Sequence, residues 1–307
     1  MSEYHNPVLL LPSVDALVTK ADGIYADATF GGGGHSREIL SRLSPRGRLI
    51  SFDRDADALQ GAIDDPRFTL IHNNFRFIHN YTLLHSPQGL DGILADLGVS
   101  SHQFDTARRG FSFRYSAPLD MRMNVQGGKT AADIVNSYTQ EELEKVLRLY
   151  GEVDNSRRMA QLVAAARAKS PILTTDDLDN AIAAALPTFA EHKVLAKVYQ
   201  ALRIEVNEEM RSLEMFLEGA AASLKRGGRL VVITYHSLED RMVKNFIKTG
   251  NTEGKEDKDV FGRLSAPLSA VFRKPVLPAE SEIASNTRAR SAKLRVARKN
   301  GPDKDGR

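Results

Sequence analysis

Short apolar runs and helical patterns alternate along most of this chain. The runs with strand character cover residues 24–28, 48–53, 68–72, 90–96 and 229–234. Segments with apolar residues at helical spacing separate most of them, and this alternation is typical of a parallel sheet with crossover helices. The pattern therefore predicts an α/β protein with a doubly wound, mostly parallel sheet. In such a sheet a ligand binds beyond the carboxyl ends of the strands.

Only helix signals occur between about residues 130 and 186. Thr139-Gln-Glu-Glu142 has the form of a capping box, and Thr174-Thr-Asp-Asp177 marks another helix start. These helices exceed what one crossover needs, so we expect an inserted helical subdomain rather than an outer layer of the core. The predicted division is 1–105 for the first part of the core, 106–205 for the insert and 206–307 for the second part of the core.

Four glycines at positions 31–34 follow the first predicted strand and precede a helix. Glycine lets backbone adopt positive φ and pass close to a ligand, and a strand–glycine loop–helix unit holds nucleotide cofactors. Asp53, at the end of the next strand, is placed to accept hydrogen bonds from a ribose. No Lys-Ser/Thr pair follows the glycines, and His35 stands where a dinucleotide pattern has a third spaced glycine. With Asp27 before the loop, these features favour S-adenosylmethionine (AdoMet), the alternative being a flexible loop without a ligand.

Polar residues after the later strands are candidates for catalysis. Methyl transfer to an exocyclic amine needs an acceptor for the amine N–H and in-line positioning of the methyl group. Asp96 fits the acceptor role, the alternative being an aspartate that caps the next turn, and Ser101 lies in the loop that follows. His236 follows the last strand, where a lone histidine is more often structural. Phe75 follows the third strand and could cover an adenine or simply belong to the core.

Composition limits the class of protein. The 307 residues are 42% hydrophobic and include no cysteine, so a sizeable core is feasible, whereas disulfides and thiolate metal sites are excluded. The polar N-terminus lacks a secretion-signal pattern, and no apolar run is long enough to span a bilayer. We therefore expect a cytoplasmic protein without membrane contact, and nothing in the sequence implies a metal cofactor.

Positive charge is concentrated in two segments, although the net charge is only +3. Arg108-Arg-Gly-Phe-Ser-Phe-Arg114 interleaves cations with aromatics, which suits phosphate contact and base stacking, or a surface loop anchored by its phenylalanines. Residues 286–299 carry basic side chains and no acid, and the alternation at 293–296 predicts an edge strand with one basic face. This segment is either a positively charged surface that binds nucleic acid or a tail that increases solubility. Arg203 and Asn207 lie one helical turn apart, a spacing that slightly favours solvent over a ligand.

Motifs in order along nearly the whole chain resemble those of one family. They are His5-Asn-Pro-Val-Leu-Leu, Asp27-Ala-Thr-Phe-Gly-Gly-Gly-Gly-His-Ser, Asp91-Gly-Ile-Leu-Ala-Asp-Leu-Gly-Val-Ser-Ser, Arg109-Gly-Phe-Ser-Phe, Pro118-Leu-Asp-Met-Arg-Met, Gln200-Ala-Leu-Arg-Ile, His236-Ser-Leu-Glu-Asp-Arg and Arg288-Ala-Arg-Ser-Ala-Lys-Leu-Arg. Together they resemble the RsmH (MraW) family of bacterial 16S ribosomal RNA cytosine-N4 methyltransferases.

The resemblance implies a Rossmann-like core that binds AdoMet, releases S-adenosylhomocysteine and acts on a cytosine in the decoding region of 16S rRNA. The substrate would be this RNA, within the small ribosomal subunit, and a homodimer is left open. By matching motif positions, the cofactor would contact Gly33, Gly34, His35, Asp53, Phe75, Asp96 and Gln103. Asp96 would then serve both the cofactor and the target amine. The RNA contacts that we expect are Arg109, Arg114, Arg203, Arg288, Arg290 and Lys293.

Two segments depart from the family pattern. Lys193-Val-Leu-Ala-Lys197 stands where members usually carry His-Pro-Ala-Thr-Arg, and Gly151-Glu-Val-Asp154 stands where they carry Gly-Glu-Glu-Arg. Lysine is a point charge and cannot bind phosphate in the bidentate manner of arginine. Both segments lie in or beside the insert, so they bear on the RNA contacts rather than on the cofactor site.

Two other functions compete with this interpretation. A DNA amino-methyltransferase usually has Pro-Pro and an aromatic residue after the acid of the fourth strand, and this chain has Leu97-Gly-Val-Ser there. An RNA-binding or ribosome-assembly factor would keep the fold without turnover. Failure to bind AdoMet would favour this second alternative.

Overall fold

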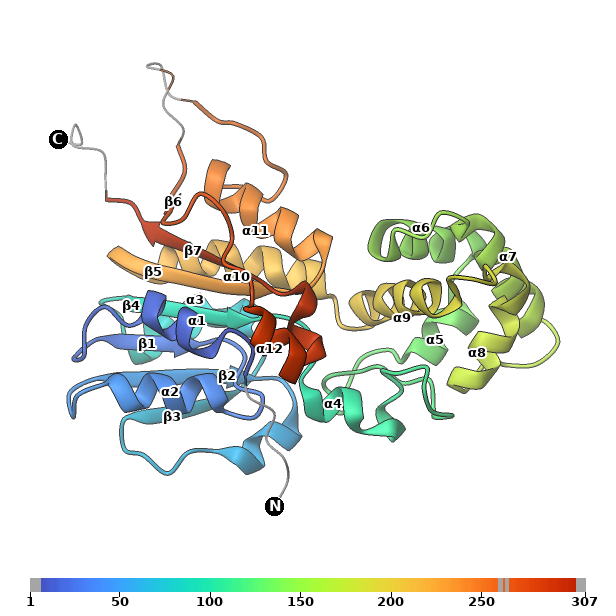
Figure 1. Cartoon of the computed structure of the whole chain (residues 1–307), viewed down its shortest axis with the longest axis horizontal. Coiled ribbons are helices and arrows are strands. Elements are labelled where there is room, and N and C mark those ends of the chain that lie inside the picture. The colour runs from blue at the N-terminus through green and yellow to red at the C-terminus, as the bar shows by residue number, and fades with distance from the viewer. Residues whose placement is uncertain (1–6, 259–261, 263–264, 302–307) are drawn as a thin grey trace. The chain divides into compact units, whose positions relative to one another are not determined.

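The structure is a computed structural model, and it describes residues 7–258, 262 and 265–301 (Figure 1). The chain divides into two compact units. Unit 1 comprises Met1–Gly98 and Arg211–Arg307, and unit 2 is the intervening segment Val99–Met210. The predicted insert, 106–205, lies within unit 2.

Unit 1 is built on a seven-stranded sheet with the strand order β3-β2-β1-β4-β5-β7-β6. The strands are β1 (Ile24–Asp27), β2 (Arg48–Asp53), β3 (Phe68–His72), β4 (Leu90–Asp96), β5 (Leu224–Thr234), β6 (Leu268–Ala270) and β7 (Lys293–Lys299). Strands β1 to β5 pair in parallel, whereas β7 is antiparallel to both β5 and β6. The predicted doubly wound, mostly parallel sheet is confirmed.

Helices cover both faces of this sheet. They are α1 (Leu10–Leu17), α2 (Gly34–Arg42), α3 (Ile78–His85), α10 (Glu209–Ser223), α11 (Ser237–Thr249) and α12 (Glu280–Ser285), with short 3-10 turns η1 (Ala56–Gly61), η2 (Phe75–Phe77) and η5 (Thr287–Ser291). In Figure 1, α1, α2 and α12 lie on the near face, and α3 and α10 lie behind the sheet. Leu17 and Ile39 of two near-face helices join Leu94 and Val231 of the central strands in one fully buried cluster. Because both faces are covered, the central strands are apolar almost throughout.

The basic segment near the C-terminus forms β7, which is not the edge strand that the sequence predicted. β7 lies between β5 and β6, and the three-residue β6 forms that edge of the sheet. Leu294 and Val296 are buried, so the predicted alternation is confirmed while the predicted position in the sheet is wrong. Alternation reports only which side chains are buried, whereas the neighbours of a strand depend on segments far away in sequence.

Unit 2 is helical and has a core of its own. Its elements are α4 (Ser101–Asp105), α5 (Ala131–Ser137), α6 (Gln140–Gly151), α7 (Ser156–Arg167), α8 (Thr175–Ile182) and α9 (Glu191–Val206), with turns η3 (Ala107–Arg109) and η4 (Ala183–Ala185). Leu147, Met159, Leu178 and Leu202 bring four of these helices into one buried cluster. Both predicted helix starts, at Thr139 and Thr174, are capping boxes.

Within the part of the chain that the structure describes, no helix is both long and apolar enough to cross a membrane.

Candidate functional site

The strand order of unit 1 reverses between β1 and β4, and in a doubly wound sheet the carboxyl ends of the strands at such a reversal border the ligand crevice. From β1 the chain proceeds outward through β2 to β3, and after β4 it continues on the other side through β5. Asp27, Asp53 and Asp96 are the last residues of β1, β2 and β4. In a doubly wound sheet this reversal is where ligands bind.

The glycine loop turns between β1 and α2 in a conformation that side chains disfavour. Gly31 and Gly33 have φ angles of 51° and 75°. Gly34 begins α2, and a Cβ added there would come within 2.1 Å of Pro7 Cγ, so the chain near the N-terminus packs directly against the loop. The loop therefore uses glycine both for its backbone angles and for this close approach.

Asp53 holds the loop in place. Its Oδ2 accepts a hydrogen bond from Gly31 N at 2.8 Å, and its Oδ1 accepts one from Asp55 N at 2.8 Å. Burial raises the pKa of Asp53. Each carboxylate oxygen can accept a further hydrogen bond, so the residue has capacity left for a ribose hydroxyl.

Asp27 is fully buried beneath the loop and faces the interior. Its Oδ2 accepts from Ser36 Oγ at 2.6 Å, and its Oδ1 accepts from Thr29 N at 3.1 Å. Burial raises the pKa of its carboxyl group. Asp27 therefore joins the end of β1 to the first turn of α2.

Asp96 lies in a cluster with His35 and Tyr235. Tyr235 donates from its hydroxyl to Asp96 Oδ1 at 2.7 Å, and His35 Nδ1 lies 3.8 Å from Asp96 Oδ2. Burial raises the pKa of Asp96 to about 6. His35 Nε2 is 3.2 Å from Val8 O, and burial lowers its pKa, so the neutral ring with its proton on Nε2 fits this site.

Phe75 stands just beyond β3, as expected. Its ring makes an edge contact with Phe216 of α10, with centroids 5.2 Å apart. Neighbouring Asn74 accepts from Arg76 N at 3.0 Å and donates to Ser212 Oγ at 3.3 Å. The turn is thus fixed on both sides, and Phe75 remains partly exposed.

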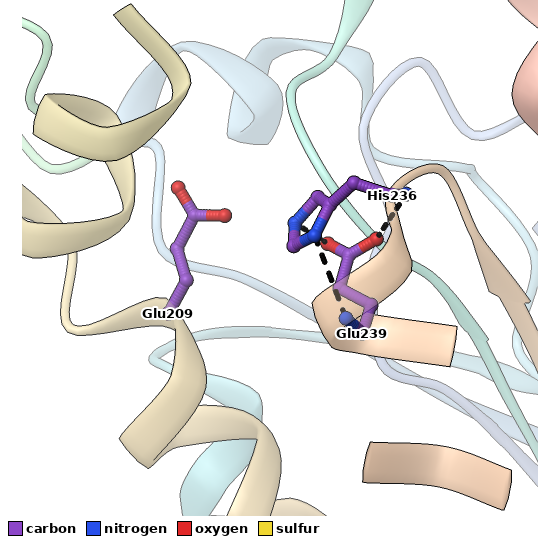
Figure 2. A group of neighbouring side chains, drawn as sticks. All are labelled: Glu209, His236 and Glu239. Atoms are coloured by element: carbon purple, nitrogen blue, oxygen red, sulfur yellow. Dashed lines mark hydrogen bonds and ion pairs between the residues drawn. The ribbon is translucent and has the colours of Figure 1, made fainter. Parts of the chain in front are cut away.

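His236 caps α11. Figure 2 shows its imidazole beside the Glu239 carboxylate in the first turn of the helix. Glu239 Oε2 accepts from Tyr235 N at 2.8 Å, and His236 Nε2 lies 3.1 Å from Glu239 Oε1. This capping box gives the histidine a structural role, and the prediction that it is catalytic stays a prediction. Glu209, also drawn in Figure 2, belongs to unit 2, where it accepts two hydrogen bonds from Arg203.

Several predicted site residues of unit 2 have internal partners. Gln103 is buried and forms a capping box with Ser100 at the start of α4. Arg109 is buried and donates to the carbonyl oxygens of Arg122 and Met123 at 2.9 and 3.0 Å. These contacts fix both side chains within unit 2, and their roles toward cofactor and RNA stay predictions.

Asn207 is not solvated, although its spacing from Arg203 slightly favoured solvent. It is buried, accepts from Met123 N at 2.8 Å and donates to Met121 O at 2.8 Å. The helical spacing could not reveal this contact, because its partners lie more than 80 residues away in the sequence. Arg114, in contrast, is exposed. The side chain of Ser101 lies outside the described residues.

The basic C-terminal residues differ in their surroundings. Lys293 and Arg295 both pair with Asp240 of α11, at 3.3 and 2.6 Å. Arg288 and Arg290 are exposed on η5. The charge of β7 is therefore partly neutralised within unit 1, and η5 presents the more accessible cations.

Sequence reasoning missed Tyr235 and Pro7. Tyr235 follows a buried strand directly, but no pattern identifies the carboxylate that its hydroxyl contacts. Pro7 lies in a quoted motif, yet its position against Gly34 depends on contacts between chain segments. Both are consequences of tertiary packing.

The chain was compared with a family model, with curated proteins and with solved structures. Residues 2–300 match the model of the MraW methylase family. The chain is 55% identical over 296 residues to ribosomal RNA small subunit methyltransferase H of Bacteroides fragilis, covering 96% of this chain and 97% of that protein. It is 53% identical over 297 residues to the protein of the same name from Flavobacterium johnsoniae, covering 97% and 98%. The crystal structure of an rRNA methylase from Streptococcus thermophilus aligns over 94% of this chain and 92% of that one, with a TM-score of 0.41 and 12% identity.

Proposed function

The chain belongs to the MraW methylase family, and on that premise we propose that it transfers a methyl group from AdoMet to the N4 amine of a cytosine in 16S rRNA. The curated relatives named above are small-subunit rRNA methyltransferases and are similar over almost their whole length. The observation that carries the proposal is the meeting of the glycine loop, Asp53 and Asp96 where the strand order reverses.

The residues of the crevice suit AdoMet. The loop has no Cβ at 31–34, so its backbone can approach a ligand closely. Asp53 keeps acceptor capacity for the ribose hydroxyls, and Phe75 offers a partly exposed ring to the adenine. His35 and Asp96 border the place for the reactive end of the cofactor. Bound there, AdoMet supplies an electrophilic methyl group on a sulfonium centre.

Asp96 is the proposed acceptor for the target amine. The lone pair of the cytosine amine is delocalised into the ring, so the amine needs help to act as a nucleophile. A carboxylate that accepts a hydrogen bond from its N–H returns electron density to nitrogen. As the nitrogen–carbon bond forms and the carbon–sulfur bond breaks, the N–H proton leaves, and a carboxylate with a pKa of about 6 can take it and pass it to water.

RNA recognition is assigned to exposed cations of both units. Arg114 of unit 2 and Arg288 and Arg290 of unit 1 present guanidinium groups at the surface. Arginine binds phosphate in a bidentate manner and stacks on bases, so these residues suit a folded RNA substrate.

The test is transfer of labelled methyl from AdoMet, with small ribosomal subunits from a strain lacking this gene and bare 16S RNA as parallel substrates. Digestion to nucleosides should place the label in N4-methylcytidine, and excess S-adenosylhomocysteine should suppress it. Label in another nucleoside would contradict the assigned position. Tight AdoMet binding without transfer to either RNA would indicate a different nucleic acid, and absence of AdoMet binding would favour a non-catalytic RNA-binding factor.

A further inference from the structure

Tyr235 contacts Asp96 at a place where the fold fixes both residues. Tyr235 directly follows β5, and its backbone N–H donates to Glu239 Oε2 at 2.8 Å. Asp96 ends the neighbouring β4, and its backbone N–H donates to Thr29 Oγ1 at 2.7 Å. Their side chains meet in the 2.7 Å hydrogen bond from the tyrosine hydroxyl to Asp96 Oδ1.

We propose that Tyr235 is a positioning residue for methyl transfer, because its hydroxyl occupies Oδ1 of Asp96 and reserves Oδ2 for the amine of the substrate. This inference rests on the proposed function, since it assigns separate tasks to the two oxygens of the proposed acceptor. Tyr235 touches Asp96 and acts through it.

The direction of the hydrogen bond is fixed. Burial and the nearby Asp96 carboxylate raise the pKa of Tyr235 well above its usual value, so the phenol keeps its proton at every working pH. The hydroxyl therefore donates, and a donated hydrogen bond stabilises the ionised carboxylate. Among the described residues, Tyr235 is the side chain that donates a hydrogen bond to Asp96.

The other groups around Asp96 do not replace this donor. His35 on α2 faces Oδ2 at 3.8 Å, but its Nε2 proton is directed to Val8 O, so Nδ1 turns a lone pair to the carboxylate. Asp27 of β1 and Glu239 of α11 are negative charges that disfavour ionisation of Asp96. The hydrogen bond from the Tyr235 hydroxyl favours the ionised carboxylate against these charges, so losing the hydroxyl should raise the pKa of Asp96.

The oxygen left for substrate has a defined task in the reaction. The nitrogen lone pair forms the new bond to the methyl carbon, and the electrons of the carbon–sulfur bond go to sulfur. The electrons of one N–H bond return to nitrogen as its proton passes to Oδ2. Fixing the plane of the carboxylate through Oδ1 keeps Oδ2 aligned for this transfer.

The experiment compares Tyr235→Phe with Tyr138→Phe in the full chain. Tyr138 makes the same kind of bond, donating to Glu205 Oε1 at 2.7 Å in unit 2, so its loss controls for removal of a tyrosine–carboxylate bond. Methyl transfer to small ribosomal subunits is measured from pH 5 to 9, with AdoMet affinity measured by calorimetry. In parallel, the titration of the Asp96 carboxyl group is followed by NMR on carboxyl-labelled protein. The Asp96 signal is assigned as the one that is missing from the spectrum of Asp96→Asn.

For Tyr235→Phe we expect kcat to fall about tenfold at neutral pH, the acid limb of the rate profile to move up by about one pH unit, and AdoMet affinity to stay within about twofold. The pH midpoint of the Asp96 NMR titration should also move up. Tyr138→Phe should change neither the rate profile nor this titration midpoint. An unmoved acid limb and titration in Tyr235→Phe, or equal losses in both variants, would overturn the proposal. If the wild-type protein transfers no methyl group, the proposed function fails, and the NMR titration separately decides whether Tyr235 controls Asp96.

Discussion

At the scale of single residues, the candidate site consists of carboxylates that are fully or partly buried and whose oxygens have unequal numbers of hydrogen-bond donors. Asp27 has both oxygens engaged inside unit 1, and Asp53 has both engaged by loop N–H groups. For Asp96, the side-chain donor found among the described residues binds Oδ1. The sequence predicted the position of Asp53 and Asp96 at strand ends, because the apolar runs stop there. It could not predict which oxygens remain open, because the donors come from other strands and helices.

Replacing Asp96 by asparagine should change how stability depends on pH. The pKa of Asp96 rises from its ordinary 3.8 to about 6 in the folded protein. Between these values the folded state binds more protons than the unfolded state, so the free energy of unfolding of the wild type falls as pH rises from about 4 to 6. Asparagine does not titrate, so Asp96→Asn lacks this loss and should gain on the order of 3 kcal/mol relative to wild type across that interval.

Urea unfolding of both proteins at pH 4.5, 5.5, 6.5 and 7.5 measures this difference. Acids that do not interact with Asp96 titrate equally in the two proteins, so their effects cancel, whereas Asp27 and Glu239, whose charges act on Asp96, contribute to the difference. A difference in unfolding free energy that stays constant with pH would show that Asp96 is not perturbed by burial.

At the scale of elements, the glycine loop and the chain before α1 form one packed unit. Leu9 N donates to Glu282 Oε1 at 2.7 Å, and Val8 O accepts from His35, while Pro7 packs on Gly34. The loop, α2 and α12 therefore hold the same short segment. The sequence predicted a loop that binds a cofactor but gave no sign of this segment over it, because glycine spacing carries no information on distant packing.

Gly34→Ala tests this packing. Alanine is the better helix former by about 1 kcal/mol, so a free helix start would gain stability. Here the added Cβ would lie 2.1 Å from Pro7 Cγ, and the segment cannot move without losing its contacts to His35 and Glu282. We expect a net loss of about 1–3 kcal/mol in unfolding free energy, with weaker AdoMet binding.

Gly127→Ala is the matched control, because nothing lies within 4 Å of a Cβ added there. Its unfolding free energy should stay within about 0.5 kcal/mol of wild type, with unchanged AdoMet affinity by calorimetry. Equal behaviour of the two variants would mean that Pro7 is not held against the loop.

At the scale of the whole molecule, the order of strands and helices predicted the sheet, and the excess of helix signals predicted an insert. Both inferences use local periodicity, which survives in the sequence because each element must bury one face. The predicted edge position of β7 and the predicted solvation of Asn207 were wrong. Both features depend on contacts between segments that are distant in the sequence, and local periodicity does not report such contacts. The same limit applies to charge. The sequence does not reveal an acidic partner for Lys293 or Arg203, whereas in the structure Lys293 forms an ion pair with Asp240 and Arg203 forms one with Glu209.

RNA binding should therefore depend on the exposed cations of η5 more than on those of β7. Replacing Arg288 and Arg290 together by alanine removes two phosphate contacts, so the slope of log K against log salt should become shallower by about 1.5. The control is Lys255→Ala with Lys258→Ala, which removes the same charge from exposed side chains of unit 1 that pair with Glu253 and Glu256. Fluorescence anisotropy of labelled 16S RNA over a salt series measures both slopes. Equal slopes in the two double variants would mean that η5 does not contact phosphate, and that only the net charge of the protein affects RNA binding.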